Sequence, residues 1–207
     1  MTVDRTDGQN TFTTPSVVIN YGIRERWELV AQFSVQQGSG TEITDPGVFL
    51  QTVLKEGVLQ DKDGRSLAVE AGPLLPSTVN GERGVGFECT GIVSGRLEPL
   101  TFHVNLGGGV DRSDAQPFVT WGVIGKLPVI QRLRLVSEVN GQSTKGQRPN
   151  NSVLVGVIWQ PFPSNMFLDA AIRRGMSSGA PDWEFTAGVT FGFTLVSSHQ
   201  KREKERQ

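Results

Sequence analysis

The sequence has few of the residues that build covalent or metal-bound sites. Among 207 residues there are one cysteine, Cys89, and two histidines, His103 and His199. A single cysteine excludes an internal disulfide and any multi-cysteine metal cluster. An excess of basic charge is also missing, because 20 Lys and Arg residues face 21 Asp and Glu residues, for a formal net charge of −1. We therefore expect no nucleic acid among the partners.

Long apolar runs are absent as well. No stretch reaches the about 18 apolar residues of a transmembrane helix, so none is predicted. Met1 is followed by TVDRTDGQN, which has no apolar core, so this stretch is not a signal peptide. A membrane β-barrel is still compatible with these features, because its strands alternate apolar and polar residues and score as mildly hydrophobic.

Strict alternation is what the sequence does contain. In PDWEFTAGVTFGFTLV, residues 181–196, every second residue from Trp183 to Leu195 is apolar, and those between, such as Glu184 and Thr190, are small or polar. Side chains alternate across a β-strand, so this pattern predicts a strand with one apolar and one polar face. The 25 glycines and 11 prolines suit a fold with many turns.

The same alternation recurs in eleven segments, most of them nine to fourteen residues long, near 14–23, 26–36, 45–55, 65–75, 84–94, 98–109, 117–127, 130–141, 151–160, 165–174 and 183–196. An ordinary strand has about five or six residues, whereas a tilted membrane-crossing strand needs roughly nine to eleven. No helical periodicity of useful length is present. The pattern predicts an all-β fold, an antiparallel up-and-down transmembrane barrel.

The links between these segments alternate in length. Short links such as IRER, SGRLEP and KLPV are followed by longer polar ones such as LPSTVNGERG and GQSTKGQRPN, with KEGVLQDKDGRS as an exception on the short side. Short periplasmic turns and longer outside loops are typical of bacterial outer-membrane barrels.

Several stretches also resemble a known family. SVVINYGIRERWELVAQFS, TDPGVFLQTVL, RSLAVEAGPLLP, LVSEVNGQS and LDAAIRRGMSSGAPDWEFTAGVTFGF, spread from about Thr14 to Phe193, are similar to bacterial outer-membrane barrels catalogued as phenol-degradation "MetA-pathway" proteins and labelled as transporters. The resemblance implies a twelve-stranded outer-membrane barrel that passes small aromatic or hydrophobic compounds.

Eleven segments are one short of that number, and single-chain bacterial barrels close with an even number of strands. We therefore expect a signal peptide and a first strand ahead of Met1, since TVDRTDGQN is too polar and short to supply the twelfth strand. Residues 1–196 are expected to form a single barrel domain. The charged residues 197–207 are expected to be a solvated, disordered tail, because such charge runs rarely pack.

The polar faces of the segments are expected to line the lumen. The candidate lumen-lining residues are Arg26, Glu28, Gln51, Glu70, Glu88, His103, Asn105, Arg132, Arg134, Glu138, Asn140, Asp169, Arg173 and Glu184. They form either a structural network of salt bridges and hydrogen bonds or a polar conduit whose charges select solutes. In both cases we expect at least two of four carboxylates to lie within salt-bridge distance of an inward arginine, the four being Glu70, Glu138, Asp169 and Glu184.

Catalysis has little support in the sequence. His103 is the only credible general base, with Ser94 and Glu88 on the preceding segment, and no recognised nucleophile or metalloprotease motif accompanies them. We expect no enzyme activity, no cofactor and no metal. Cys89 shares its face with Val85 and Phe87 and is expected to face lipid.

Three functions remain open. A channel or transporter for small molecules in the bacterial outer membrane fits the strand length and the resemblance best, with the lipid bilayer as partner. A structural or interaction barrel that passes nothing is the first alternative. The second is a soluble lipocalin-like barrel with its apolar face turned inward, because alternation alone does not distinguish inside from outside.

Overall fold

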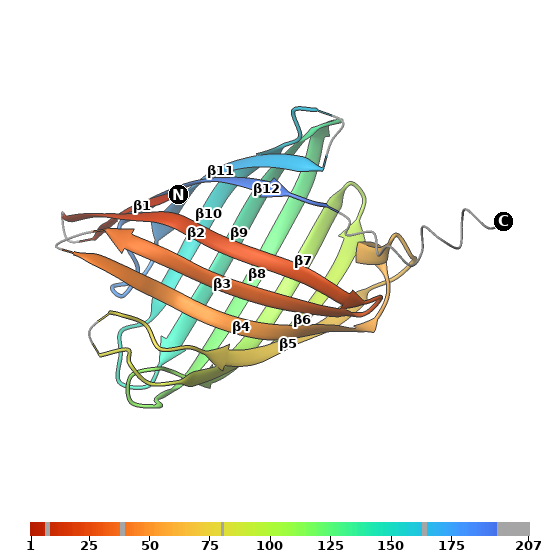
Figure 1. Ribbon diagram of the computed structural model, residues 1–207. Coiled ribbons are helices and arrows are strands. Elements are labelled where there is room, and N and C mark those ends of the chain that lie inside the picture. Colours follow the sequence, from red (N-terminus) through yellow and green to blue (C-terminus); the bar gives the residue numbers. More distant parts are fainter. Residues whose placement is uncertain (7–8, 38–39, 80, 163–164, 194–207) are drawn as a thin grey trace, which may run out of the picture.

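Twelve antiparallel strands form one closed barrel (Figure 1). The computed structural model describes residues 1–6, 9–37, 40–79, 81–162 and 165–193, apart from the side chain of Gln9. Each strand pairs with its neighbours in sequence, and the first pairs with the last. The strands are β1 (Thr2–Thr6), β2 (Gln9–Arg24), β3 (Trp27–Gln37), β4 (Thr41–Lys55), β5 (Ser66–Leu74), β6 (Gly86–Leu97), β7 (Leu100–Val110), β8 (Pro117–Ile130), β9 (Leu133–Thr144), β10 (Asn150–Trp159), β11 (Met166–Gly175) and β12 (Trp183–Phe191).

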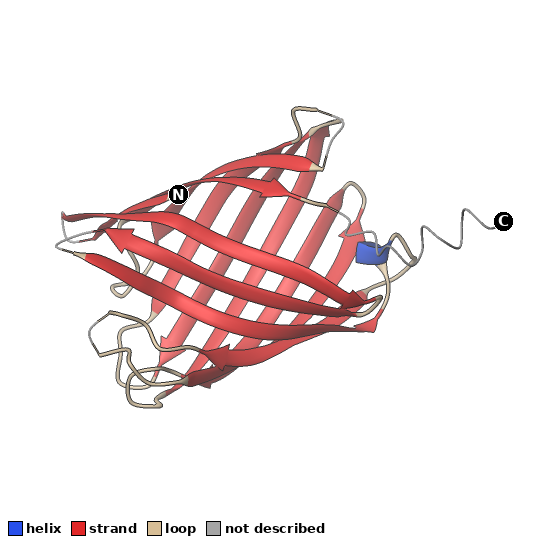
Figure 2. Ribbon diagram, viewed as in Figure 1, coloured by secondary structure: helices blue, strands red, loops and turns tan. Residues whose placement is uncertain are grey.

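One short 3₁₀ helix interrupts this pattern in the described residues. It is η1 (Val58–Gln60), in the link between β4 and β5 (Figure 2). No helix in the described ranges is long and apolar enough to cross a membrane.

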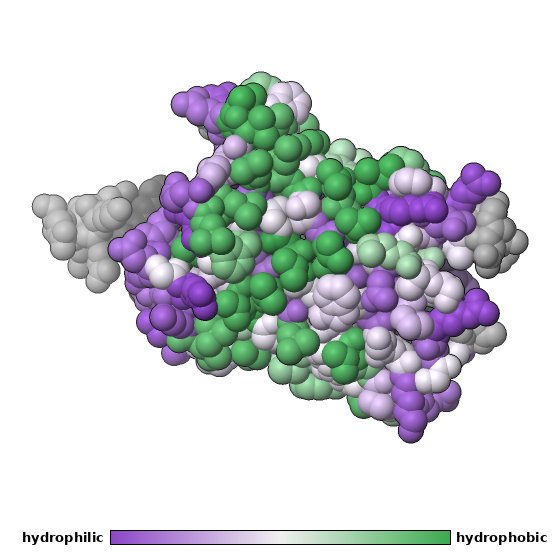
Figure 3. Space-filling view, turned by 180° about the vertical axis from the view of Figure 1, so that it is seen from behind, coloured by the Kyte–Doolittle hydropathy of each residue, from purple (hydrophilic) through white to green (hydrophobic). Residues whose placement is uncertain are grey.

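The apolar faces of the strands point outward. On β12, the alternate residues Phe185, Val189 and Phe191 are exposed, as are Val119, Trp121 and Val123 on β8. On the face seen in Figure 3, apolar residues in green cover the middle of the barrel, and hydrophilic residues gather toward both ends. The interior carries the polar faces, so the lipocalin-like alternative, which needs the apolar face inside, is wrong.

The twelfth strand is β1, and the expectation that TVDRTDGQN could not supply it was wrong. Val3 pairs with Phe185 of β12 and Phe12 of β2, while Asp4 pairs with Glu184 and Thr11. Five residues are enough because both backbone edges of the short strand find partners, which compensates for its polar composition. The pairing with β1 also explains why β2 begins at Gln9, earlier than predicted.

Each of the eleven predicted segments overlaps one of the other strands, although several strand ends are displaced, most of all the start of β2 at Gln9 and the start of β4 at Thr41. β12 ends at Phe191, so residues 192 and 193 of the predicted segment 183–196 lie beyond the strand. Residues 194–196 and the predicted tail 197–207 fall outside the described residues.

The two ends of the barrel differ in their links. At one end, called the turn end, the links are 25–26, 56–65, 98–99, 131–132 and 160–165; at the other, the loop end, they include 75–85, 111–116, 145–149 and 176–182. The long 56–65 link at the turn end is the exception predicted from the sequence. Glu56 in this link pairs with both Arg26 and Lys62, and the hydrogen bond from Lys62 lowers the pKa of the Glu56 carboxyl.

Arg112 ties two loop-end links to strand β4. Its Nε donates to the carbonyl of Leu75 at 2.8 Å, its Nη2 to the carbonyl of Pro46 at 3.1 Å, and its Nη1 lies 3.5 Å from Asp45 Oδ1. The Arg112 side chain is only 10% exposed, so these bonds fix the 111–116 and 75–85 links against the irregular start of β4.

Candidate functional site in the barrel lumen

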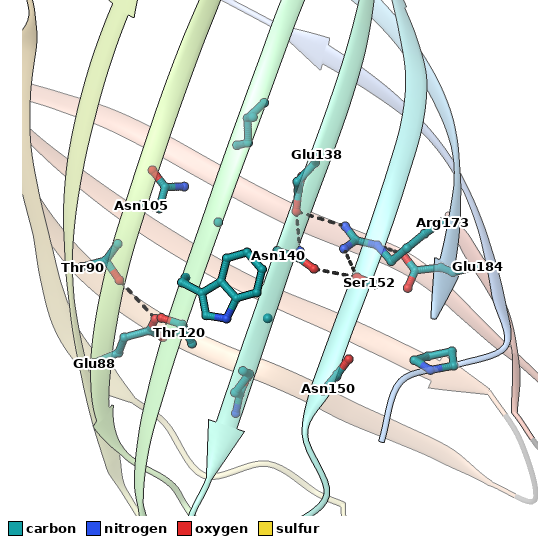
Figure 4. Close-up of a pocket in the computed structure, with 16 residues that line it drawn as sticks. Glu88, Thr90, Asn105, Thr120, Glu138, Asn140, Asn150, Ser152, Arg173 and Glu184 are labelled. Atoms are coloured by element: carbon teal, nitrogen blue, oxygen red, sulfur yellow. Dashed lines mark hydrogen bonds and ion pairs between the residues drawn. The ribbon is translucent and has the colours of Figure 1, made fainter. Parts of the chain in front are cut away.

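A polar cavity of about 440 Å³ lies in the lumen, against the wall formed by β6 to β12 (Figure 4). Six of the predicted lumen residues line this cavity, namely Glu88, Asn105, Glu138, Asn140, Arg173 and Glu184. Their side chains come from several different strands, and strand pairing brings them together: Arg173 pairs directly with Glu184, and Asn140 with Ser152. These contacts join residues that are far apart in the sequence.

Arg173 is the centre of the charged network. Its Nη2 lies 3.6 Å from Glu138 Oε1, and its Nε lies 3.5 Å from Glu184 Oε1. The second contact is an ion pair without hydrogen-bond geometry, since the buried Nε has no hydrogen-bond partner in the described part of the chain. Two carboxylates therefore lie within salt-bridge distance of an inward arginine, which confirms that expectation.

Neutral polar groups complete the network. Arg173 Nη1 donates to Ser152 Oγ at 2.9 Å, and Ser152 Oγ donates to Asn140 Oδ1 at 2.6 Å. The Asn140 amide in turn donates to Glu138 Oε1. Figure 4 shows these side chains converging from β9, β10, β11 and β12 on one point of the wall. The chain of contacts fixes the orientation of the charges, because its polar members hold one another in place.

Carboxylates outnumber cations around this cavity. Glu88 accepts a hydrogen bond from Thr90 at 3.2 Å and has no cationic partner among the described side chains. Glu70 lies on the neighbouring strand, close enough for its charge to interact with Glu88 and Glu28. Asp4 pairs in register with Glu184. The middle of the lumen is therefore net negative, with Arg173 as its nearest counterion.

Apart from His103, the remaining predicted residues divide into three groups. Glu28, Gln51 and Glu70 are adjacent in register on β3, β4 and β5. Arg134 and Asp169 line a second cavity nearer the turn end. Arg26 and Arg132 lie in the two-residue turns 25–26 and 131–132 rather than in strands, because the strands that follow them begin one residue or a few residues later than the alternation suggested.

His103 forms a buried pair with Ser94, whose Oγ lies 2.8 Å from His103 Nδ1. A nucleophile and a base at this distance need an orienting third group and an open path to substrate. The Ser94 side chain has 0% relative exposure, so its hydroxyl is closed to a solute. Within the described ranges, no three His, Cys, Asp or Glu side chains gather into a possible metal site.

Several lumen groups were missed in the sequence, among them Ser152, Lys126 and Asp4. Ser152 precedes the apolar Val153 on β10, and Lys126 precedes the apolar Leu127 on β8. Both therefore follow the alternation of polar inward and apolar outward residues, and the same pattern would have found them. Asp4 was missed because β1 was not predicted.

The architecture defines a class: a closed twelve-stranded antiparallel barrel, apolar outside and polar inside. Among solved structures, the chain is similar to one described as the COG4313 outer membrane channel from Pseudomonas putida F1, with a TM-score of 0.55 and 11% sequence identity over 91% of this chain and 90% of that one. At this identity the likeness concerns the fold, that of an outer-membrane barrel. No family model matches the chain, and no curated protein matches it.

Proposed function

We propose that this protein is a channel of the bacterial outer membrane that lets small solutes pass through its lumen. The observation that carries the proposal is a closed barrel with an apolar belt outside and a polar cavity of about 440 Å³ inside. A protein of this form is stable in a bilayer, because every strand pairs with two others and the apolar faces meet lipid. The fold of the channel from Pseudomonas putida F1 supports the same assignment.

The charges of the lumen favour cationic over anionic solutes in its middle section. Glu70, Glu88, Glu138 and Glu184 carry negative charge there, and Arg173 is the one arginine within salt-bridge distance of any of them in the described structure. Rings of carboxylates select cations in other channels. The resemblance to the phenol-degradation barrels supports small aromatic or hydrophobic compounds as physiological solutes.

The test is a liposome-swelling assay with sugars and aromatic acids, followed by reversal potentials in planar bilayers under a salt gradient. We expect swelling with the smallest sugars and a potential of cation-selective sign. Glu88→Gln should reduce cation selectivity, because it removes a carboxylate without a cationic partner. Glu25→Gln, in the exposed turn 25–26, is the matched control and should leave selectivity unchanged.

Two results would contradict the proposal. Liposomes containing the folded barrel that swell with no solute would favour the structural or interaction barrel instead. Recovery of the protein without detergent, rather than with outer membranes, would contradict the location.

A further inference from the structure

A second cavity, of about 350 Å³, lies in the lumen nearer the turn end, between β9, β10, β11 and β12. Its wall differs from that of the polar cavity. The inward side chains there are largely apolar, namely Val136, Leu154, Ile158, Phe167 and Ala171. Two hydroxyl side chains, Thr186 and Thr190, complete the lining on β12. Water in a lumen needs no apolar wall, whereas binding sites for small molecules are lined mainly by apolar side chains. This apolar patch therefore indicates a solute with an apolar body.

Positive charge without a counterion borders this apolar patch. The guanidinium carbon of Arg134 lies 6.0 Å from the centre of the Phe167 ring. Lys126, on the adjacent strand β8, is close enough for its charge to repel that of Arg134. In the described part of the chain, neither cation has a carboxylate within salt-bridge distance, and the exposed Arg134 side chain is open to the lumen. Cations beside apolar groups are stabilised by a bound anion.

Asp169 restricts where that anion can bind. Arg134 pairs in register with Ile158, and Ile158 with Asp169, so one strand separates the two charged residues. Two strand spacings place their backbones about 10 Å apart. A carboxylate must therefore lie at the Arg134 side of the cavity, away from Asp169. The space between the two is lined by Ile158 and Leu154 and suits the uncharged part of the same molecule.

We infer that this cavity is a binding site for monocarboxylates with an apolar body of several carbons. The carboxylate binds the planar guanidinium of Arg134, which matches it in shape, with Lys126 adding a second positive charge. The apolar body packs on Phe167, Leu154 and Ile158. The inference rests on the proposed channel function, and it adds the chemical class of a ligand for the turn-end section of the lumen, where Arg134 and Lys126 carry positive charge, in contrast to the negatively charged middle section.

The test is equilibrium binding by calorimetry to the full chain in detergent. The probes are hexanoate, cyclohexanecarboxylate and benzoate, with acetate, hexanol and hexylamine as comparisons. We expect the larger carboxylates to bind at least about tenfold more tightly than acetate or hexylamine, because only they engage both the arginine and the apolar wall. The relative affinities of benzoate and cyclohexanecarboxylate show whether the apolar body is preferred as aromatic or as aliphatic.

Variants locate the site. Arg134→Gln should weaken carboxylate binding by about tenfold, the effect of losing a charge-assisted hydrogen bond. Asp169→Asn should strengthen it several-fold, because a repelling charge is removed. Arg132→Gln makes the same charge change in the neighbouring turn, where the arginine lies 3.5 Å from the Pro161 carbonyl, and should have no effect. If Arg134→Gln does not fold, Arg134→Lys keeps the charge, and binding should still weaken because the planar fork is lost.

Equal effects of the Arg134 and Arg132 changes would overturn the inference, as would weaker binding by the Asp169 variant or tighter binding of hexylamine. Binding at equilibrium does not require passage through the barrel. A barrel that conducts sugars and binds none of the carboxylates would refute this site alone, whereas a barrel that binds them and conducts nothing would refute the channel.

Discussion

Arg173 offers the sharpest test of how the lumen is stabilised. Replacing it with Gln leaves Glu138 and Glu184 without their cationic partner, while an amide can still bond Ser152. The three side chains are 19%, 20% and 22% exposed, so water screens the charges only in part. At an effective dielectric constant of about 20, each pair contributes about 4 kcal/mol of attraction, most of which offsets the cost of desolvation. We expect a net loss of about 2–4 kcal/mol.

Two companion variants separate the charge from the hydrogen bonds. Glu138→Gln alone should cost about 1 kcal/mol, because Arg173 keeps Glu184 and the Asn140 amide can still donate to the new side-chain oxygen. The triple change of Arg173, Glu138 and Glu184 to Gln should recover most of the loss, since no unpaired charge remains.

The assay is urea unfolding in phospholipid bilayers, followed by tryptophan fluorescence and by the shift in migration of unheated samples in SDS. Solute flux through the Glu138→Gln barrel is measured alongside. Unchanged flux indicates a purely structural network, and an altered preference between anionic and cationic solutes indicates selection as well. An Arg173→Gln barrel as stable as the parent would refute the reasoning, as would a triple variant less stable than the single one.

Three further predictions concern other parts of the barrel. Val189→Arg, on the outward face of β12, should block assembly at a cost of roughly 2–4 kcal/mol, whereas Thr190→Arg, facing the lumen, should be tolerated better; greater damage from the Thr190 change in an assembly assay would reverse the assignment of the faces. Arg112→Ala should leave the barrel folded and speed proteolysis of the loop-end links, and unchanged cleavage would show that its three bonds are dispensable. The ion pairs of Glu56 with Lys62 and Arg26 should be present at neutral pH and lost as pH falls through the lowered pKa of Glu56. In a carboxyl-carbon NMR titration, Lys62→Met should return the pKa of Glu56 toward its ordinary range. An unchanged pKa would contradict the assignment of Lys62 as the cause.

The sequence by itself determined eleven of the twelve strands and the two faces of each. Side chains along a β-strand alternate between its two faces, whichever environment each face meets. Phe185 and Glu184 therefore had to point in opposite directions in any strand containing both. Strand length and the alternation of short and long links then indicated a membrane barrel. The placement of Glu138 and Arg173 on polar strand faces followed from the same local pattern, without knowledge of the partner strands.

Only the tertiary structure decided which face is outside and how the barrel closes. The alternation of polar and apolar residues is the same in a barrel with its apolar face inside. Only the arrangement of all twelve strands shows that the apolar faces point outward. β1 is too short and polar to be recognised alone, and it forms a strand because β12, at the far end of the sequence, and β2 pair with its two edges. The network around Arg173 likewise depends on the register between β9, β10, β11 and β12, which local sequence does not specify.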